Sequence, residues 1–293
     1  PGSVIYGSDA IGGVMSFNTL TPEFSITDKP FIDANAYLRY ASANNEKTGH
    51  LDINLGWKKW AFITSVSTND YDHLRQGSHG PKDYIKDYHV QRVDTCDYVV
   101  YQEDPLLQIP TAYSQFNLMQ KIRYKLNNNW EINYGFHLSE TTSYGRYDRH
   151  NRVRNGTARY AEWEYGPQKW MMHQLSTEHD GANLLYNKMS LRMAFQQFEE
   201  SRIIRSLNSN KRSLQTEKVN AFSFNADFVK SLNDRNTVFY GVEGVVNDVN
   251  STGEEVSIAS NQSEASSSRY PQSNWSSYGI YVKDQFKINN TLS

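Results

Sequence analysis

The chain has 293 residues, 30 basic and 32 acidic side chains, and a formal net charge of -2. This balance offers no basic field for nucleic acid, so we expect no nucleic-acid partner. Mean hydropathy is -0.71, and no stretch approaches the ~18 apolar residues of a helical membrane span. These values still allow a β-barrel, because only every second residue of its wall has to be apolar.

Residues 1–19 form a glycine-rich run that does not follow the pattern of the rest of the chain. Gly7 and the pair Gly12-Gly13 permit positive φ angles, and Ser8-Asp9 can cap a turn. Taken alone, the run is a glycine-rich turn before a short strand. The chain begins at Pro1 without a methionine, and we expect it to be an internal piece of a longer polypeptide.

From residue 31 onward the dominant period is two, which predicts β-strands. For example, Trp130, Ile132 and Tyr134 alternate with Glu131 and Asn133. Several strands exceed the five or six residues usual in soluble proteins and approach the ~9–11 residues of a tilted membrane strand. About ten strands are predicted, at 33–42, 48–57, 60–71, 113–126, 130–146, 168–179, 187–204, 214–229, 237–249 and 274–288.

Short and long connections alternate along the chain. The long loops are expected at 72–112, 147–167, 205–213 and 250–273, and the short turns at 58–59, 127–129, 181–183, 233–236 and 289–290. Bacterial barrels have short turns on the periplasmic side and long loops outside. The predicted fold is therefore all-β: an antiparallel up-and-down transmembrane β-barrel, present here in part, as about ten strands of a larger plugged barrel.

The run from Gly2 to Val14 closely resembles the segment that ends the plug domain of TonB-dependent outer-membrane receptors. There, Gly-Pro-x-Ser-x-x-Tyr-Gly-Ser-x-Ala-x-Gly-Gly-Val precedes the first barrel strand, whereas Pro1-Gly2 stands here where Gly-Pro is usual. The signature residues in this chain are Gly2, Tyr6, Gly7, Ser8, Asp9, Gly12 and Gly13.

The resemblance implies that residues 1–30 end a plug and that residues 31–293 begin a barrel of twenty-two strands, a size typical of plugged transporters. It also implies a place in the bacterial outer membrane and uptake of a scarce ligand, most often a ferric siderophore or haem. Outer-membrane lipid, the TonB energy-coupling complex and an extracellular ligand are the implied partners. The family's energy-coupling box is absent from this sequence.

Strand alternation also predicts which side chains face lipid and which face the lumen. The expected outward set is Leu55, Trp57, Leu118, Ile122, Ile132, Tyr134, Phe136, Leu191, Met193, Phe224 and Ile280. The expected inward set is Lys121, Arg123, Asn133, His137, Arg192, Asn225 and Lys283.

The loops 72–112 and 147–167 share one side of the membrane and are rich in aromatic and basic residues. We expect ligand contacts at His79, Tyr84, Tyr88, His89, Arg146 and Tyr147. The alternatives without a ligand are a solvated polar loop, aromatic side chains that pack in the girdle or the loop, and a basic cluster that contacts lipopolysaccharide or solvent. That cluster comprises Arg146, Tyr147, Arg149, His150, Arg152 and Arg154.

No motif of an enzyme is present, and no resident cofactor or metal site is expected. The adjacent acidic pair Glu199-Glu200 cannot form a two-carboxylate site in a strand, because neighbouring side chains point opposite ways. Two alternatives stay open: a passive porin or enzyme barrel, and a soluble β-rich binding or adhesion protein. The identity of the ligand is not fixed by the sequence.

Overall fold

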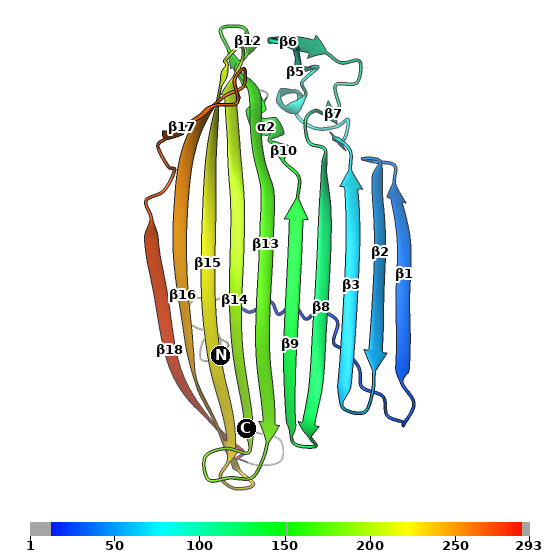
Figure 1. The fold of residues 1–293 in the computed structure, drawn as a ribbon, viewed down its shortest axis with the longest axis vertical. Helices are drawn as coiled ribbons and strands as arrows, with labels where there is room; N and C mark the ends of the chain where they lie inside the picture. The colour runs from blue at the N-terminus through cyan, green and yellow to red at the C-terminus, as the bar shows by residue number, and fades with distance from the viewer. Residues whose placement is uncertain (1–12, 151, 289–293) are drawn as a thin grey trace.

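The computed structural model describes residues 13–150 and 152–288, and these form one large, twisted antiparallel sheet (Figure 1). In chain order the elements are β1 (Phe31–Ala41), β2 (Glu46–Gly56), β3 (Trp60–Tyr71), β4 (Leu74–Arg75), η1 (Lys82–Tyr84), β5 (Tyr88–Val93), β6 (Cys96–Tyr101), β7 (Leu107–Gln108), β8 (Tyr113–Asn127), β9 (Trp130–Thr141), β10 (Tyr144–Gly145), α2 (Tyr147–His150), β11 (Val153–Arg154), β12 (Thr157–Ala158), β13 (Tyr160–Asp180), β14 (Lys188–Ser206), β15 (Lys211–Ser231), β16 (Asn236–Ser257), β17 (Ser263–Ser266) and β18 (Ser273–Phe286).

The main sheet has 12 strands, of which β10 and β17 are short additions. The long strands follow chain order from β1 through β2, β3, β8, β9, β13, β14, β15 and β16 to β18, and every pair is antiparallel. This confirms the predicted up-and-down topology. Such an open sheet is one arc of a barrel, since lipid does not tolerate unpaired strand edges.

The strands β13 to β16 are longer than the alternation predicted. They contain 21, 19, 21 and 22 residues. The expected loop 205–213 is therefore wrong: β14 and β15 are joined by the short turn 207–210. The expected loops 147–167 and 250–273 are also shorter, because β13 begins at Tyr160 and β16 continues to Ser257. Figure 1 still shows the longest loops gathered at one end of the sheet.

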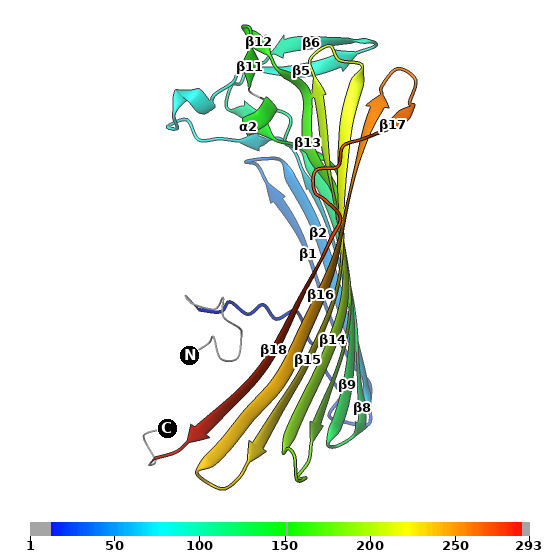
Figure 2. The same ribbon diagram turned by 90° about the vertical axis from the view of Figure 1, so that its left-hand side faces the viewer.

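The N-terminal segment lies against one face of the sheet and is anchored there by two cations. Lys121 Nζ donates hydrogen bonds to the carbonyl oxygens of Thr19 and Leu20, at 3.4 and 2.8 Å. Arg123 Nη1 donates to the carbonyl oxygen of Pro22 at 2.6 Å. We call the face that carries Lys121 and Arg123 the inner face. In Figure 2 the segment and the folded part of the upper loops lie on the same side of the sheet.

The anchor continues across β2 and β8. The Glu23 backbone N–H donates to Asn54 Oδ1 at 3.2 Å, and the Phe24 ring lies 4.2 Å from Lys125 Nζ. Gly56 has a specific role here, since a Cβ at this position would stand 2.2 Å from the Glu23 carbonyl oxygen. The end of β2 therefore needs glycine for the segment to approach so closely.

The register places the two predicted sets on opposite faces. Lys121, Gly135 and Gln174 follow one another on the inner face, next to the row of Arg123 and Asn133. On the outer face, Trp57, Met193 and Ile280 are 43%, 42% and 83% exposed. No second sheet covers this face within the described residues, so the sandwich of a soluble β protein is excluded. No described helix is long and apolar enough to cross a membrane.

Two levels on the outer face mark the borders of an apolar belt. At the end with short turns, aromatic side chains form a girdle. The ring centroids of Trp60 and Tyr124 are 4.2 Å apart, those of Trp130 and His179 are 4.6 Å apart, and Phe228 stacks on Tyr240. Such aromatic girdles mark the membrane interfaces of barrels.

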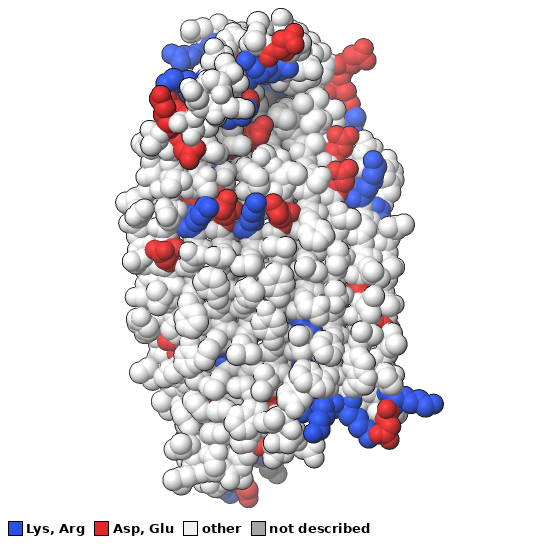
Figure 3. Space-filling view, viewed as in Figure 1, with Lys and Arg blue, Asp and Glu red and all other residues white. Residues whose placement is uncertain are grey.

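Nearer the loops, four charged residues form a ladder across neighbouring strands. Lys169 pairs with Glu140 at 3.2 Å, Lys218 pairs with Glu199 at 3.0 Å, and Lys169 stands opposite Glu199 in the register. Figure 3 shows a row of basic and acidic side chains above a largely uncharged belt. Girdle and ladder are about ten residues apart along β9, β13, β14 and β15, which matches the length of a tilted membrane strand.

This arrangement predicts the position of the lipid. In a Cys96→Ser background, a fluorophore attached to the cysteine of Phe222→Cys, below the ladder, should be quenched by lipids brominated in their acyl chains. The same fluorophore on Thr216→Cys, above the ladder on the same face of β15, should not be quenched by these lipids. Equal quenching at the two positions would contradict this membrane border.

Candidate ligand site

The long loop between β3 and β8 is an ordered structure with its own hydrogen bonds. Gln102 Nε2 donates to the carbonyl oxygens of Lys86, Asp104 and Leu107, at 3.4, 2.9 and 2.7 Å. One side-chain amide therefore ties three parts of the loop together. The strands β5 and β6 form a hairpin, which turns at Asp94 with a positive φ of 53°.

The hairpin is clasped to the top of the wall by buried charges. Arg205 at the end of β14 donates to both carboxylate oxygens of Asp97, at 2.7 and 2.9 Å, and to Glu162 Oε1 at 2.9 Å. The side chains of Arg205 and Asp97 are 2% and 0% exposed. Arg212 of β15 also pairs with Glu162. We call these four residues the clasp.

The clasp is electrostatically balanced. Burial on its own raises the pKa of Asp97, but hydrogen bonds from Arg205 and from the Asn208 backbone N–H outweigh burial and hold this pKa below its usual value. The pKa of Glu162 is lowered in the same way, since Arg212 and Arg205 outweigh its burial. Both carboxylates are therefore ionised at neutral pH, and three arginines surround them, because Arg92 of the hairpin also pairs with Asp97 at 3.1 Å.

His150 is a structural residue of the neighbouring loop and does not extend its basic surface. Its Nε2 accepts a hydrogen bond from the Trp163 backbone N–H at 3.1 Å. Burial lowers the pKa of His150 to about 4, so the imidazole is neutral and can accept this bond. The expected basic cluster is therefore wrong at this position, and the short helix α2 is fixed to β13.

A cavity of about 650 Å³ lies between the two loops. It is lined by Leu74, Gln76, Asp83, Tyr84, Lys86, Gln108, Thr111, Gly145, Tyr147, Asp148 and Arg152. Tyr84 and Tyr147 were both expected as ligand contacts, and the fold brings them to the same cavity. The Tyr147 hydroxyl also accepts a hydrogen bond from the Lys86 backbone N–H at 3.1 Å, which joins the loops.

The other expected contacts do not line this cavity. His79 bonds to Ser78 at the exposed surface, while Tyr88 and His89 belong to the β5–β6 hairpin. Arg146 lies beside the cavity and forms two hydrogen bonds with Asp148, at 2.9 and 2.7 Å. No group of three or more His, Cys, Asp or Glu side chains suited to a metal ion occurs within residues 13–150 and 152–288.

Arginines and aromatic rings meet on the wall above the membrane. The guanidinium of Arg146 lies 5.2 Å from the Trp163 ring, and that of Arg202 lies 5.3 Å from it. Both arginines also donate to the Tyr165 hydroxyl, at 3.2 and 2.7 Å. Trp163 itself is only 7% exposed, so these arginines cover its ring and fix the top of the wall.

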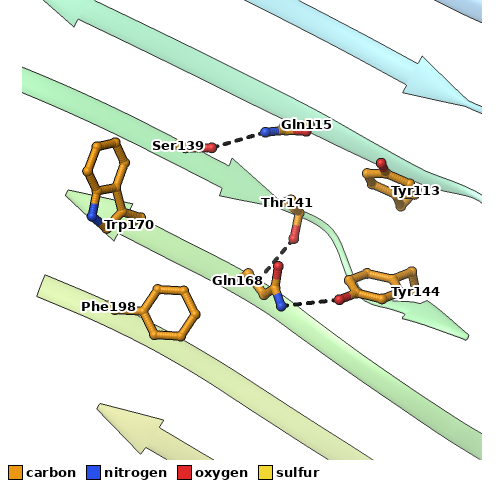
Figure 4. A pocket seen from close by; sticks show the side chains of 8 residues that line it. All are labelled: Tyr113, Gln115, Ser139, Thr141, Tyr144, Gln168, Trp170 and Phe198. Atoms are coloured by element: carbon orange, nitrogen blue, oxygen red, sulfur yellow. Dashed lines mark hydrogen bonds between the residues drawn. The ribbon is translucent and has the colours of Figure 1, made fainter. Parts of the chain in front are cut away.

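A second cavity, of about 470 Å³, lies on the wall below the loops (Figure 4). It is lined by Tyr113, Gln115, Ser139, Thr141, Tyr144, Gln168, Trp170 and Phe198. Gln168 Nε2 donates to the Tyr144 hydroxyl at 3.1 Å and to Glu200 Oε2 at 2.6 Å. Aromatic faces alternate here with amide and hydroxyl groups, which suits a ligand with apolar rings and polar edges.

The sequence interpretation missed this second cavity because it placed ligand contacts only in the loops. A signal was nevertheless present. Trp170 and Phe198 stand opposite each other on the inner face, in a row that continues through the polar residues Ser139 and Asn117 on one side. Large aromatic side chains on the wet face of a barrel strand have no lipid to contact, so they indicate packing against a ligand or plug.

No protein-family model and no curated protein matches the chain. Three solved structures share its fold. The copper transporter OprC aligns with a TM-score of 0.61 and 11% identity, over 92% of this chain and 36% of OprC. The unliganded ferric citrate transporter FecA aligns with a TM-score of 0.60 and 13% identity, over 99% of this chain and 40% of FecA.

The third is the ferric yersiniabactin uptake receptor FyuA from Yersinia pestis, with a TM-score of 0.55 and 10% identity, over 98% of this chain and 48% of FyuA. This chain thus spans less than half the length of each of the three proteins. Its fold is that of the TonB-dependent outer-membrane receptors, the family that the glycine signature resembles. Of that signature, only Gly13 lies within the described residues, with a φ of 132° that favours glycine.

Proposed function

We propose that this chain is part of an outer-membrane active transporter that takes up a scarce extracellular ligand with energy supplied by TonB. Residues 1–30 then end the plug, and residues 31–293 form the first part of the barrel wall. The anchoring of residues 19–24 by Lys121, Arg123 and Asn54 supports this division. Coupling to TonB would involve plug residues that precede this chain in the receptor.

One observation carries the proposal: a cavity between ordered loops, with an aromatic cavity on the wall beneath it. Loops on a rigid barrel can capture a ligand before a plug moves. The proposed ligand is a ferric siderophore or haem, because Lys86 and Arg152 line the loop cavity and aromatic rings line the wall cavity, which together suit an anionic molecule with rings. Ferric ligands are also named for FyuA and FecA, and copper for OprC. The proposed role is not enzymatic.

The test uses the intact receptor in cells that lack their own siderophore and haem receptors. Haemin and a panel of radio-iron-labelled ferric siderophores should give uptake that disappears when TonB is deleted. Tyr84→Ala combined with Tyr147→Ala should weaken binding by about tenfold or more, since a buried aromatic contact often contributes ~2 kcal/mol. Tyr98→Ala, on β6 and outside the cavity, is the matched control.

Two results would contradict the proposal. Unchanged binding in the double variant would show that capture occurs elsewhere. TonB-independent passage of small solutes, without saturable uptake of any iron complex, would favour a passive porin.

A further inference from the structure

His137 is an inward-facing histidine in the middle of the wall, and the proposed ligand cavities do not include it. The residue is 9% exposed. Within the described part of the chain, no group forms a hydrogen bond with its imidazole. By contrast, each of the following imidazoles bonds to a neighbouring group: His50, His73, His150, His173 and His179.

Two methionines flank this imidazole. In the register, Met119 of β8 and Met172 of β13 both stand directly opposite His137 of β9. Opposed residues of neighbouring strands have their Cβ atoms about 5 Å apart, and the flexible methionine side chain can bend its sulfur toward a neighbour. The three side chains therefore form one row across the inner face, with a thioether on each side of the imidazole.

The neighbours of the row differ on its two sides. Gly135, two residues before His137, has no side chain, and a Cβ there would still stand 3.7 Å from His137 Nε2. The ring centroid of Trp170 lies 5.9 Å from that of His137 on the opposite side. The imidazole therefore faces a position without a side chain at Gly135, next to the Lys121 stem, and has the Trp170 ring on its other side.

The chemistry of this row selects one class of ion. The two thioethers are soft, uncharged ligands that favour monovalent copper, the imidazole also suits copper, and hard divalent cations prefer oxygen ligands. Lys121 lies in the next row, opposite Gly135, and its charge opposes a doubly charged ion more than a singly charged one. We propose that Met119, His137 and Met172 bind a soft monovalent metal ion of the copper(I) class. This site does not depend on the proposed uptake function.

Silver(I) is the probe, because it is soft, monovalent and stable in air. The intact receptor is purified in detergent in a Cys96→Ser background, since the exposed thiol of Cys96 would bind silver itself. Calorimetric titration should show that Met119→Leu, Met172→Leu and His137→Gln each lose one tightly bound silver ion. X-ray absorption of the loaded receptor should show both sulfur and nitrogen neighbours of silver.

Met171→Leu is the matched control, because Met171 is adjacent to Met172 but lies on the outer face opposite Leu138. Methionine-to-leucine changes conserve volume, and heat-modifiable electrophoretic mobility verifies that each variant folds. Equal silver binding in all variants would overturn the site. Loss in His137→Gln alone would also overturn it, as would displacement of silver by an equimolar amount of zinc.

Discussion

Replacing Phe136 with arginine is expected to disfavour insertion of the receptor by ~2–4 kcal/mol, the cost of an arginine near the middle of the bilayer. Phe136 belongs to a row that continues through His173 and Phe195 to Phe222. This row lies about midway between the aromatic girdle and the charged ladder, where lipid offers no partner for a guanidinium. The measurement is a urea titration of folding into lipid vesicles.

The control for this change lies on the other face of the same sheet. Gln196 stands next to Phe195 along β14 but faces inward, opposite Met172. Gln196→Arg should cost much less, because the wet side of the wall already carries Arg192. An equal loss for Phe136→Arg and Gln196→Arg would show that the faces are wrongly assigned.

Asp97→Asn is expected to release the β5–β6 hairpin from the wall. The change replaces the Asp97 carboxylate with a neutral amide, so the buried guanidinium of Arg205 loses the negative charge of this partner. Removing one member of a buried ion pair typically costs ~3–5 kcal/mol. Because the clasp joins a loop to the wall, we expect local undocking and not unfolding of the barrel. Hydrogen–deuterium exchange should accelerate in residues 88–101 and stay unchanged in β8 and β9.

The double variant Asp97→Asn with Arg205→Met provides the control, since it removes both charges together. It should restore part of the protection lost in the single variant, because the fully buried Arg205 guanidinium is then no longer left beside a neutral amide. If exchange of the hairpin amides is unchanged in Asp97→Asn, the clasp does not hold the loop.

The clasp also predicts the response of the hairpin to acid. The pKa values of Asp97 and Glu162 are lower in the folded protein, so their stabilisation is complete above the ordinary values of 3.8 and 4.5. It is lost as the pH falls through the lowered values. Protection of the hairpin should therefore be constant between pH 5 and 8 and decrease only below about pH 4.

The sequence alone determined the class of fold and the faces of the strands. In the membrane belt one face meets lipid and the other meets a wet interior, so apolar and polar residues must alternate. Ile132, Tyr134 and Phe136 follow this rule, and the structure places them on the outer face as predicted. The predicted strand boundaries inside the membrane belt were correct within a few residues for the same reason.

Above the ladder the alternation pattern did not predict where the strands end, and the tertiary structure determined their length. Neither face of β13 to β16 meets lipid there, so polar residues such as Glu162 occur beside apolar ones such as Trp163 without a period-two signal. Strand identity in this region comes from hydrogen bonds to the next strand, which a sequence does not display. The clasp between Asp97 and Arg205 joins residues 108 positions apart, and the row of Met119, His137 and Met172 spans three strands. The folding of the loop onto the wall decides the first contact and the strand register decides the second, and neither can be read from the sequence.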